Sequence, residues 1–91
     1  MTDFDAKLIP YLDDAARVTR WPARSRHKAD QDIILQYLTT KFALNQRYTE
    51  REVNDLLKQW HTFADWALLR RELYSRGYLN RHKDGSAYWR V

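Results

Sequence analysis

Arginine and aromatic side chains in one short segment are the groups in this sequence best suited to hold another molecule. The segment "TFADWALLRRELYSR" spans residues 62–76. An arginine guanidinium is planar and can form two parallel hydrogen bonds, which suits phosphate groups and the edges of guanine bases. If the segment forms a recognition helix, its outward residues would face a DNA major groove. These outward residues are Thr62, Trp66, Ala67, Arg70, Arg71 and Tyr74.

A basic arm precedes this segment. Residues 17–28 contain five cations and no acid, in a chain whose formal net charge is +4. If the arm neutralises about five phosphates, the log–log dependence of affinity on salt has a slope of roughly −4 to −5. Alternatively, the arm lies against the acidic residues 1–16 and cancels its own charge. The cations are Arg17, Arg20, Arg24, Arg26 and Lys28, and the acids are Asp3, Asp5, Asp13 and Asp14.

Catalytic and metal chemistry has little support in the sequence. The chain has no cysteine, and its three histidines are not at metal-ligand spacing with one another or with an acid cluster. Two isolated glycines form no phosphate-cradling loop, and no nucleophile has a base beside it. We therefore expect no enzymatic activity, no metal and no cofactor. One of the histidines, His61, is expected at a helix end, where its side chain can satisfy a last carbonyl.

Composition indicates one folded domain. The 91 residues are 44% hydrophobic and 31% charged, values typical of a globular protein. The N-terminus lacks the apolar run of a signal peptide, and no stretch approaches a membrane span. The absence of cysteine permits a reducing compartment. We therefore expect a cytoplasmic protein without a membrane partner.

The first half of the chain predicts two helices joined by the arm. Thr2 and Asp5 indicate a short capped helix that Pro10 ends. A turn and the extended arm follow, where Trp21 is either an anchor on the core or a base-stacking platform. Residues 30–42 then predict an amphipathic helix. Its apolar residues are Ile33, Ile34, Tyr37, Leu38 and Phe42.

The second half predicts two further helices, each opened by a capping box. After an extended stretch at 46–48, Thr49 and Glu52 form the first box, for a helix that turns Val53, Leu56, Leu57 and Trp60 to one side. Thr62 and Asp65 offer a second box, for a helix that runs to about Arg76. Gly77 is expected at its C-terminal cap.

The sequence closes with a predicted hairpin, "RHKDGSAYWRV". Asp84-Gly85 favours a tight turn because that turn needs positive φ, which glycine supplies freely and aspartate tolerates. We expect the hairpin to pair with the strand near Tyr48. Trp89 and Val91 are expected to face the helices, and Arg81, His82, Lys83 and Arg90 to face outward.

This order of elements is that of a winged helix-turn-helix, a mainly α (α+β) fold with a small antiparallel sheet. The predicted organisation is an N-terminal helix, turn and basic arm at 1–29 and the winged helix at 30–91, within a single compact domain. Winged-helix regulators usually bind as dimers because one module covers few base pairs, so a homodimer is an expected state.

Four blocks of the sequence together resemble one family: "RWPAR", "RYTEREVN", "WHTFADWALLRRELYSRGYL" and "DGSAYWR". The family is the bacterial domain-of-unknown-function family 2087 (DUF2087), found alone and attached to helix-turn-helix regulators. The resemblance implies a bacterial, regulator-associated domain of winged-helix character and supplies no activity. The family often has glycine in a "DxxGR" turn where this chain has Ala16, so the turn type is left open.

The leading hypothesis is a duplex-DNA-binding protein that acts in transcriptional regulation. Its rival is a module that binds a protein of the transcription machinery through exposed Trp66, Tyr74 and Tyr78, which the phosphate-repelling Asp65 favours. RNA binding is a third reading, based on charge and aromatic residues. The predicted nucleic-acid contacts are Arg20, Arg24, Arg26, Lys28, Thr62, Trp66, Arg70, Arg71, Tyr74, Arg81, Lys83 and Arg90.

Overall fold

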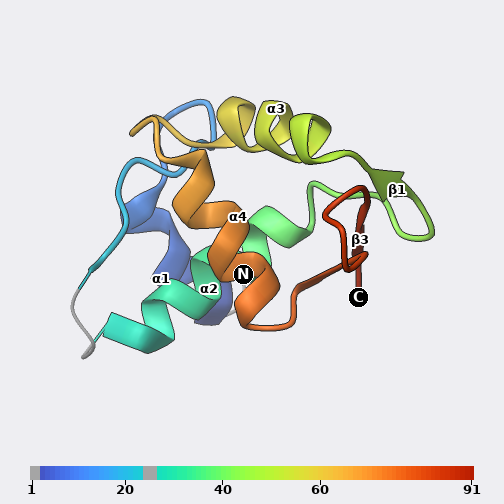
Figure 1. The fold of residues 1–91 in the computed structure, drawn as a ribbon. Helices are drawn as coiled ribbons and strands as arrows, with labels where there is room; N and C mark the ends of the chain where they lie inside the picture. The colour runs from blue at the N-terminus through green and yellow to red at the C-terminus, as the bar shows by residue number, and fades with distance from the viewer. Residues whose placement is uncertain (1–2, 24–26) are drawn as a thin grey trace.

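The computed structural model describes residues 3–23 and 27–91 as helices around a core, with a small sheet at one end (Figure 1). In Figure 1, α4 lies between α3 on one side and the α1–α2 pair on the other. The predicted class, mainly α with a small antiparallel sheet, is confirmed. The elements are α1 (Asp3–Leu8), the 3-10 helix η1 (Ile9–Tyr11), α2 (Lys28–Thr39), β1 (Arg47–Tyr48), α3 (Glu50–Trp60), α4 (Trp66–Ser75), β2 (Leu79–Arg81) and β3 (Tyr88–Arg90).

The core takes apolar side chains from every helix and from the hairpin. Full burial of a large aliphatic or aromatic side chain contributes about 1.5–3 kcal/mol relative to exposure. Leu69 and Leu73 place one side of α4 at the centre of this core, which leaves its opposite side free. The buried residues are Leu8, Tyr11, Val18, Ile34, Leu35, Leu38, Phe42, Val53, Leu57, Leu69, Leu73, Leu79 and Tyr88.

Helix α2 is shifted from its predicted range of 30–42. It begins at Lys28, two residues early, and ends at Thr39. Beyond that point the amides of Thr40 and Lys41 donate to the carbonyls three residues back, at 3.1 and 3.0 Å. This tighter turn ends the α-helical pattern but still brings Phe42 into the core, where it is 1% exposed.

The predicted capping box at the start of α3 is confirmed. The Thr49 hydroxyl accepts from the Glu52 amide at 3.1 Å, and the Glu52 carboxylate accepts from the Thr49 amide at 2.8 Å. Val53 and Leu57 are buried, and Leu56 and Trp60 are partly buried on the same side. The local pattern alone therefore predicted both the start of this helix and its inward face.

The predicted start of α4 is wrong. The helix begins at Trp66, and its N-cap is Asp65, whose carboxylate accepts from the Leu68 amide at 3.3 Å. Thr62 lies outside the helix because its amide donates to the Val18 carbonyl at 2.9 Å. The end of α4 is as predicted: Gly77, with φ +83°, follows the C-cap.

The sheet pairs as predicted but presents the opposite face to the helices. Its order is β1-β3-β2, antiparallel throughout, with Tyr48 opposite Tyr88. Tyr88, not Trp89, faces the core at 2% exposure, and Val91 is 72% exposed. Arg90, expected outward, reaches inward and donates to the Phe42 carbonyl at 3.3 Å. Side chains alternate along a strand, so an error of one position exchanges the two faces.

The hairpin turn is longer than the predicted two-residue Asp-Gly turn. The Gly85 amide donates to the His82 carbonyl at 2.9 Å, and the His82 amide donates to the Ala87 carbonyl at 2.8 Å. Gly85 has φ +77°, but Asp84 does not have positive φ. Asp84 acts through its carboxylate, which accepts from the Ser86 amide at 2.8 Å. The hydrogen bond to the Asp84 carboxylate therefore stabilises this longer turn, whereas the tight turn would have needed positive φ at Asp84.

Candidate nucleic-acid interface

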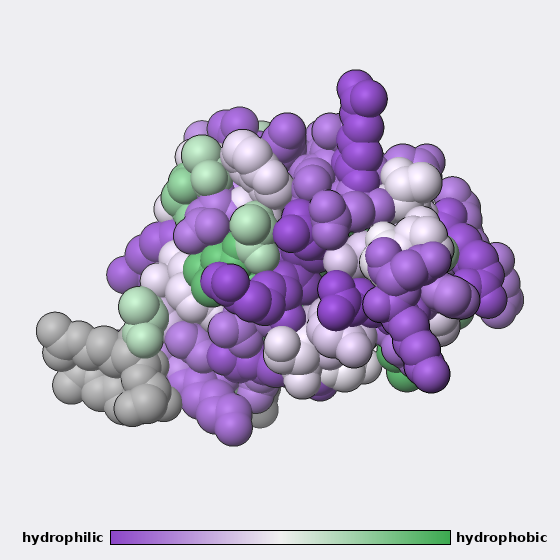
Figure 2. All heavy atoms as spheres, viewed as in Figure 1, coloured by the Kyte–Doolittle hydropathy of each residue, from purple (hydrophilic) through white to green (hydrophobic). Residues whose placement is uncertain are grey.

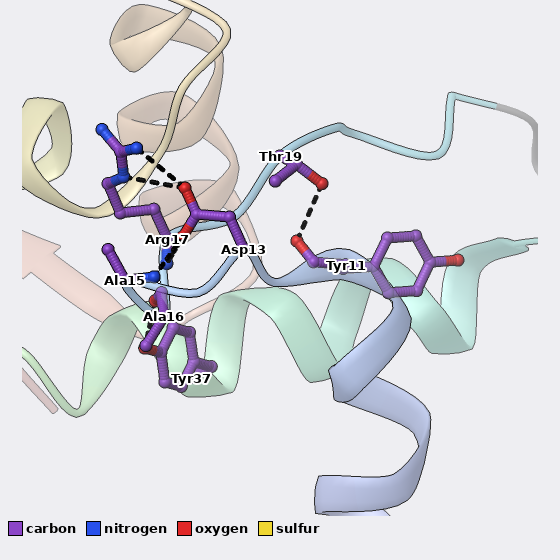
Figure 3. Close-up of polar contacts among 7 residues, drawn as sticks. All are labelled: Tyr11, Asp13, Ala15, Ala16, Arg17, Thr19 and Tyr37. Atoms are coloured by element: carbon purple, nitrogen blue, oxygen red, sulfur yellow. Dashed lines mark hydrogen bonds and ion pairs between the residues drawn. The ribbon is translucent and has the colours of Figure 1, made fainter.

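The basic arm begins at a turn built around Asp13 (Figure 3). The Asp13 carboxylate accepts from the amides of Arg17 at 2.8 Å and Ala15 at 3.0 Å, and pairs with the Arg17 guanidinium at 2.9 Å. The hydrogen bond from the Arg17 amide is the largest of the contacts that hold the pKa of Asp13 below its usual value. Ala16 has φ +61°, a left-handed conformation that glycine adopts without strain. The turn type that the resemblance left open is therefore one that suits glycine.

In the described part of the arm, Val18 and Thr19 contact the rest of the fold, and Arg20 is exposed to solvent. Val18 is fully buried, and Thr19 donates from its amide to the Tyr11 carbonyl at 2.8 Å. Arg20 is exposed, with its Cζ 4.8 Å from the centre of the Tyr11 ring. The Asp13–Arg17 pair therefore neutralises one charge of the arm, whereas Arg20 stays accessible.

Three predicted arm contacts have different outcomes. Arg24 and Arg26 lie outside the described residues. Lys28 is exposed but belongs to α2, whose first residue it is, and not to an extended arm.

An arginine network that sequence reasoning missed ties the arm to α2 and α4. Arg76 donates to Asp32 at 2.9 Å and to Gln31 at 2.6 Å, and Gln31 in turn donates to the Pro22 carbonyl. The Arg76 Cζ lies 5.7 Å from the centre of the partly buried Trp21 ring. This packing supports Trp21 as an anchor and not as a base-stacking platform. Only the helical spacing of Glu72 and Arg76 could have hinted at part of this network.

The turn between α3 and α4 is held by His61. This side chain is 4% exposed, and its Nδ1 lies 2.5 Å from the Leu57 carbonyl. Its Nε2 accepts from the Asp65 amide at 3.0 Å. Because a carbonyl only accepts and an amide only donates, these two bonds require the neutral ring with its proton on Nδ1. The predicted carbonyl contact at the helix end is present, and the link to α4 was not predicted.

Helix α4 presents a narrower outward face than predicted. Trp66 is half-buried against the core, with the Lys58 Nζ 4.3 Å from its ring. Arg70 is also half-buried, because it donates to Asn54 and lies 3.7 Å from the Glu50 carboxylate. The exposed side chains of the helix that share one face are Ala67, Arg71, Tyr74 and Ser75.

A pocket of about 300 Å³ lies where α4 meets the start of α3 and the hairpin. The Arg81 Cζ, from β2, is 4.5 Å from the centre of the Tyr74 ring. Contacts with the hydroxyls of Tyr88 and then Tyr74 raise the pKa of Arg81. Three guanidiniums and one carboxylate line the pocket, a formal excess of two positive charges. Its lining residues are Glu50, Arg70, Arg71, Tyr74, Ser75, Arg81 and Tyr88.

Outside the pocket, the hairpin contributes fewer exposed cations to the candidate interface than predicted. Lys83 is exposed at the tip, beside His82, whose Nδ1 lies 3.0 Å from the Asp84 carboxylate. Arg90 is half-buried and donates to the Phe42 carbonyl, so it is less exposed than predicted. The Arg47 Cζ lies 4.5 Å from the Trp89 ring on the other side of the sheet. The accessible cations of the hairpin therefore lie at the α4 pocket, at the tip and at a second pocket of about 290 Å³, which Arg90 lines together with Arg47 and Trp89.

Two absences hold for the described part of the chain, which is 6–23 and 27–91 for side chains and 3–23 and 27–91 for the backbone. No three histidine, cysteine, aspartate or glutamate residues gather there as metal ligands. None of the helices there combines the length and apolar character needed to cross a membrane.

Comparison with known proteins places the chain in a family. Residues 17–90 match the sequence profile of a family described as "Uncharacterized protein conserved in bacteria (DUF2087)". This match covers most of the 91 residues, and the chain belongs to the DUF2087 family. The resemblance seen in the four sequence blocks is thereby confirmed. Neither the curated proteins nor the solved structures contain a significant match.

Proposed function

We propose that this bacterial domain is a winged-helix protein that binds duplex DNA and acts in transcriptional regulation. The observation that carries the proposal is the convergence of Arg70 and Arg71 from α4 with Arg81 from the hairpin on one open pocket. A recognition helix and a wing must present cations to the same side if they are to follow one duplex. Arginine is the side chain best suited to phosphates at such a site.

The topology supports this proposal independently. The order α2, β1, α3, α4, β2, β3, with the sheet order β1-β3-β2, follows the helix-strand-helix-helix-hairpin sequence of winged helices. In that arrangement α4 corresponds to the recognition helix. Its exposed face carries Arg71 and Tyr74 and no acid, and Asp65, which lies at the N-cap, uses its carboxylate to hold the Leu68 amide.

The rival reading, a protein-docking module, has less support. It needs exposed aromatic residues, but Trp66 and Tyr78 are partly buried against the core. Tyr74 is 39% exposed, but its ring is in contact with Arg81. The face of the molecule in Figure 2 is mainly hydrophilic, with hydrophobic residues in small separate areas. Protein-docking surfaces generally expose a larger continuous apolar patch.

Fluorescence anisotropy with a duplex and a single strand of equal length tests the proposal. We expect tighter binding to the duplex, with an affinity that falls as salt is raised because bound counterions are released. Preference for the single strand would contradict the proposal and favour the RNA-type reading. No binding even at low salt would also contradict it.

Two alanine variants locate the contact surface. Arg71→Ala removes an exposed guanidinium from α4, and Lys7→Ala removes an exposed charge from α1. We expect Arg71→Ala to weaken duplex binding by about 1–3 kcal/mol and Lys7→Ala to have little effect. Equal losses in both variants would mean that net charge, and not α4, accounts for binding.

A further inference from the structure

The pocket between α3, α4 and β2 has the chemistry of a site for a phosphate group. Arg71 is exposed and has no carboxylate within ion-pair distance among the described side chains, those of residues 6–23 and 27–91. Across the pocket, Arg81 contacts an aromatic ring and two hydroxyls but no acid in the same part of the chain. Two guanidiniums without acidic partners therefore face the same space.

Hydroxyl groups complete the set of donors. Tyr74, Ser75 and Tyr88 line the pocket with the arginines. Guanidiniums and hydroxyls can surround a tetrahedral group whose oxygens only accept hydrogen bonds. A volume of about 300 Å³ is at the lower end of the range for ligand pockets, which favours a small group over a large organic ligand.

One carboxylate, that of Glu50, lies on the rim of this basic pocket. It is 3.7 Å from the Arg70 Nε and accepts from the Tyr88 hydroxyl at 3.4 Å. The Glu50 side chain is 52% exposed, and both contacts are long, so it is held only loosely. A carboxylate presents the same kind of acceptor oxygens as a phosphate and uses two of the donors that a phosphate would need.

We propose that the pocket binds a single phosphate group and that Glu50 is an internal competitor which the phosphate displaces. Arg71 and Arg81 bind the phosphate oxygens first, and Arg70 joins them when Glu50 moves to solvent. The inference relies on the proposed function for the source of the phosphate, the DNA backbone. The chemistry of the pocket itself does not depend on that source.

Charge-neutral replacement of Glu50 is the most direct test. Glu50→Gln removes the competing charge at the pocket, and Asp55→Asn makes the same charge change on an exposed residue of α3 that does not line the pocket. Inorganic phosphate is titrated against the intact chain at constant ionic strength, with chloride as the balancing anion. The arginine Nε–H signals report binding by NMR.

The proposal predicts saturable shifts of the Arg71 and Arg81 signals. Glu50→Gln should tighten phosphate binding about threefold to tenfold, while Asp55→Asn should change it by less than about twofold. Arg71→Ala should weaken binding at least about tenfold, and because Arg71 is exposed, its loss leaves the core intact. Shifts that never saturate, or equal effects of Glu50→Gln and Asp55→Asn, would overturn the proposal.

A competition experiment with duplex DNA identifies the source of the phosphate. If duplex DNA displaces inorganic phosphate from the pocket, and Glu50→Gln also tightens DNA binding, the source is the DNA backbone and both proposals stand. If phosphate binds but the duplex does not, the pocket proposal stands, its ligand is a free phosphorylated molecule, and the DNA-binding proposal fails. If the duplex binds but inorganic phosphate does not, the pocket proposal fails alone.

Discussion

Helices α3 and α4 begin at similar sequences, yet only one of them begins where its sequence predicts. Thr49 and Glu52 satisfy each other and open α3. Thr62 and Asp65 have the same spacing, but Thr62 donates its amide to Val18 and leaves Asp65 as the cap of α4. The difference teaches that a local capping pattern holds where no distant segment competes for the same amide.

The turn before α4 is decided by contacts over long sequence distances. Val18 lies in parallel register with His61 and exchanges backbone hydrogen bonds with Trp60 and Thr62. His61 then positions the Asp65 amide. A window of a few residues around Thr62 contains Trp60 and His61 but not Val18, the residue of the arm that accepts the Thr62 amide, so the local sequence cannot predict this turn.

The largest expected effect comes from removing the imidazole at this turn. His61→Ala leaves the Leu57 carbonyl and the Asp65 amide without a buried partner and opens a cavity, so we expect a loss of about 2–4 kcal/mol. Urea unfolding measures this loss, with Gln59→Ala, an exposed neighbour, as the control. Equal midpoints for the two variants would mean that His61 does not hold the turn.

Two threonine substitutions test the comparison directly. Thr49→Ala removes a capping hydroxyl and should cost about 1 kcal/mol. Thr62→Ala keeps the backbone amide that bonds to Val18, so we expect a change within about 0.5 kcal/mol. Thermal or urea unfolding of both variants gives the values. A cost for Thr62→Ala as large as that for Thr49→Ala would restore the predicted second capping box.

A glycine substitution should stabilise the turn before α4. Ala64 has φ +53°, which strains an alanine but not a glycine, so Ala64→Gly is expected to gain about 0.5–1 kcal/mol. Three residues later, Ala67→Gly lies within the helix and should lose about 0.5–1 kcal/mol. Unfolding midpoints that move in the same direction would contradict this account. Ala16→Gly, in the Asp13 turn, should behave like Ala64→Gly.

The smallest expected effect on stability concerns the hairpin turn. Like the start of α3, this turn depends on hydrogen bonds between residues close together in the sequence. Hydrogen bonds from Ser86, with a further contribution from His82, lower the pKa of Asp84 to about 2 from a model-peptide value of 3.8. A lowered pKa means that the turn is stabilised above pH 3.8 and loses this stabilisation as the pH falls towards 2. NMR titration of the Asp84 carboxyl measures the shift. Ser86→Ala removes the hydroxyl but keeps the amide bond, so it should raise the pKa of Asp84 part of the way back to 3.8. An Asp84 carboxyl that titrates near 3.8 in the unchanged chain would show that these hydrogen bonds do not stabilise its charged form.

The candidate surface was predicted in outline and corrected in detail. Arg71 and Tyr74 lie outward as the helical spacing indicates. Trp66 and Arg70 were also expected outward, but core packing and the Asn54 and Glu50 contacts draw them in. Arg90 was misplaced because the alternation along β3 was predicted one position out of phase. The errors at Arg70 and Arg90 involve partners that lie far away in the sequence, Asn54 and Phe42.

The sequence by itself determined the order of the elements, the α+β class, the capping box of α3 and the glycine that ends α4. These features depend on side-chain periodicity and on bonds between residues only a few positions apart. Only the tertiary structure decided where α4 begins, which face of the sheet is buried, and that arginines from α4 and the hairpin share one pocket with Glu50. Those outcomes depend on which distant donors and acceptors meet when the core closes.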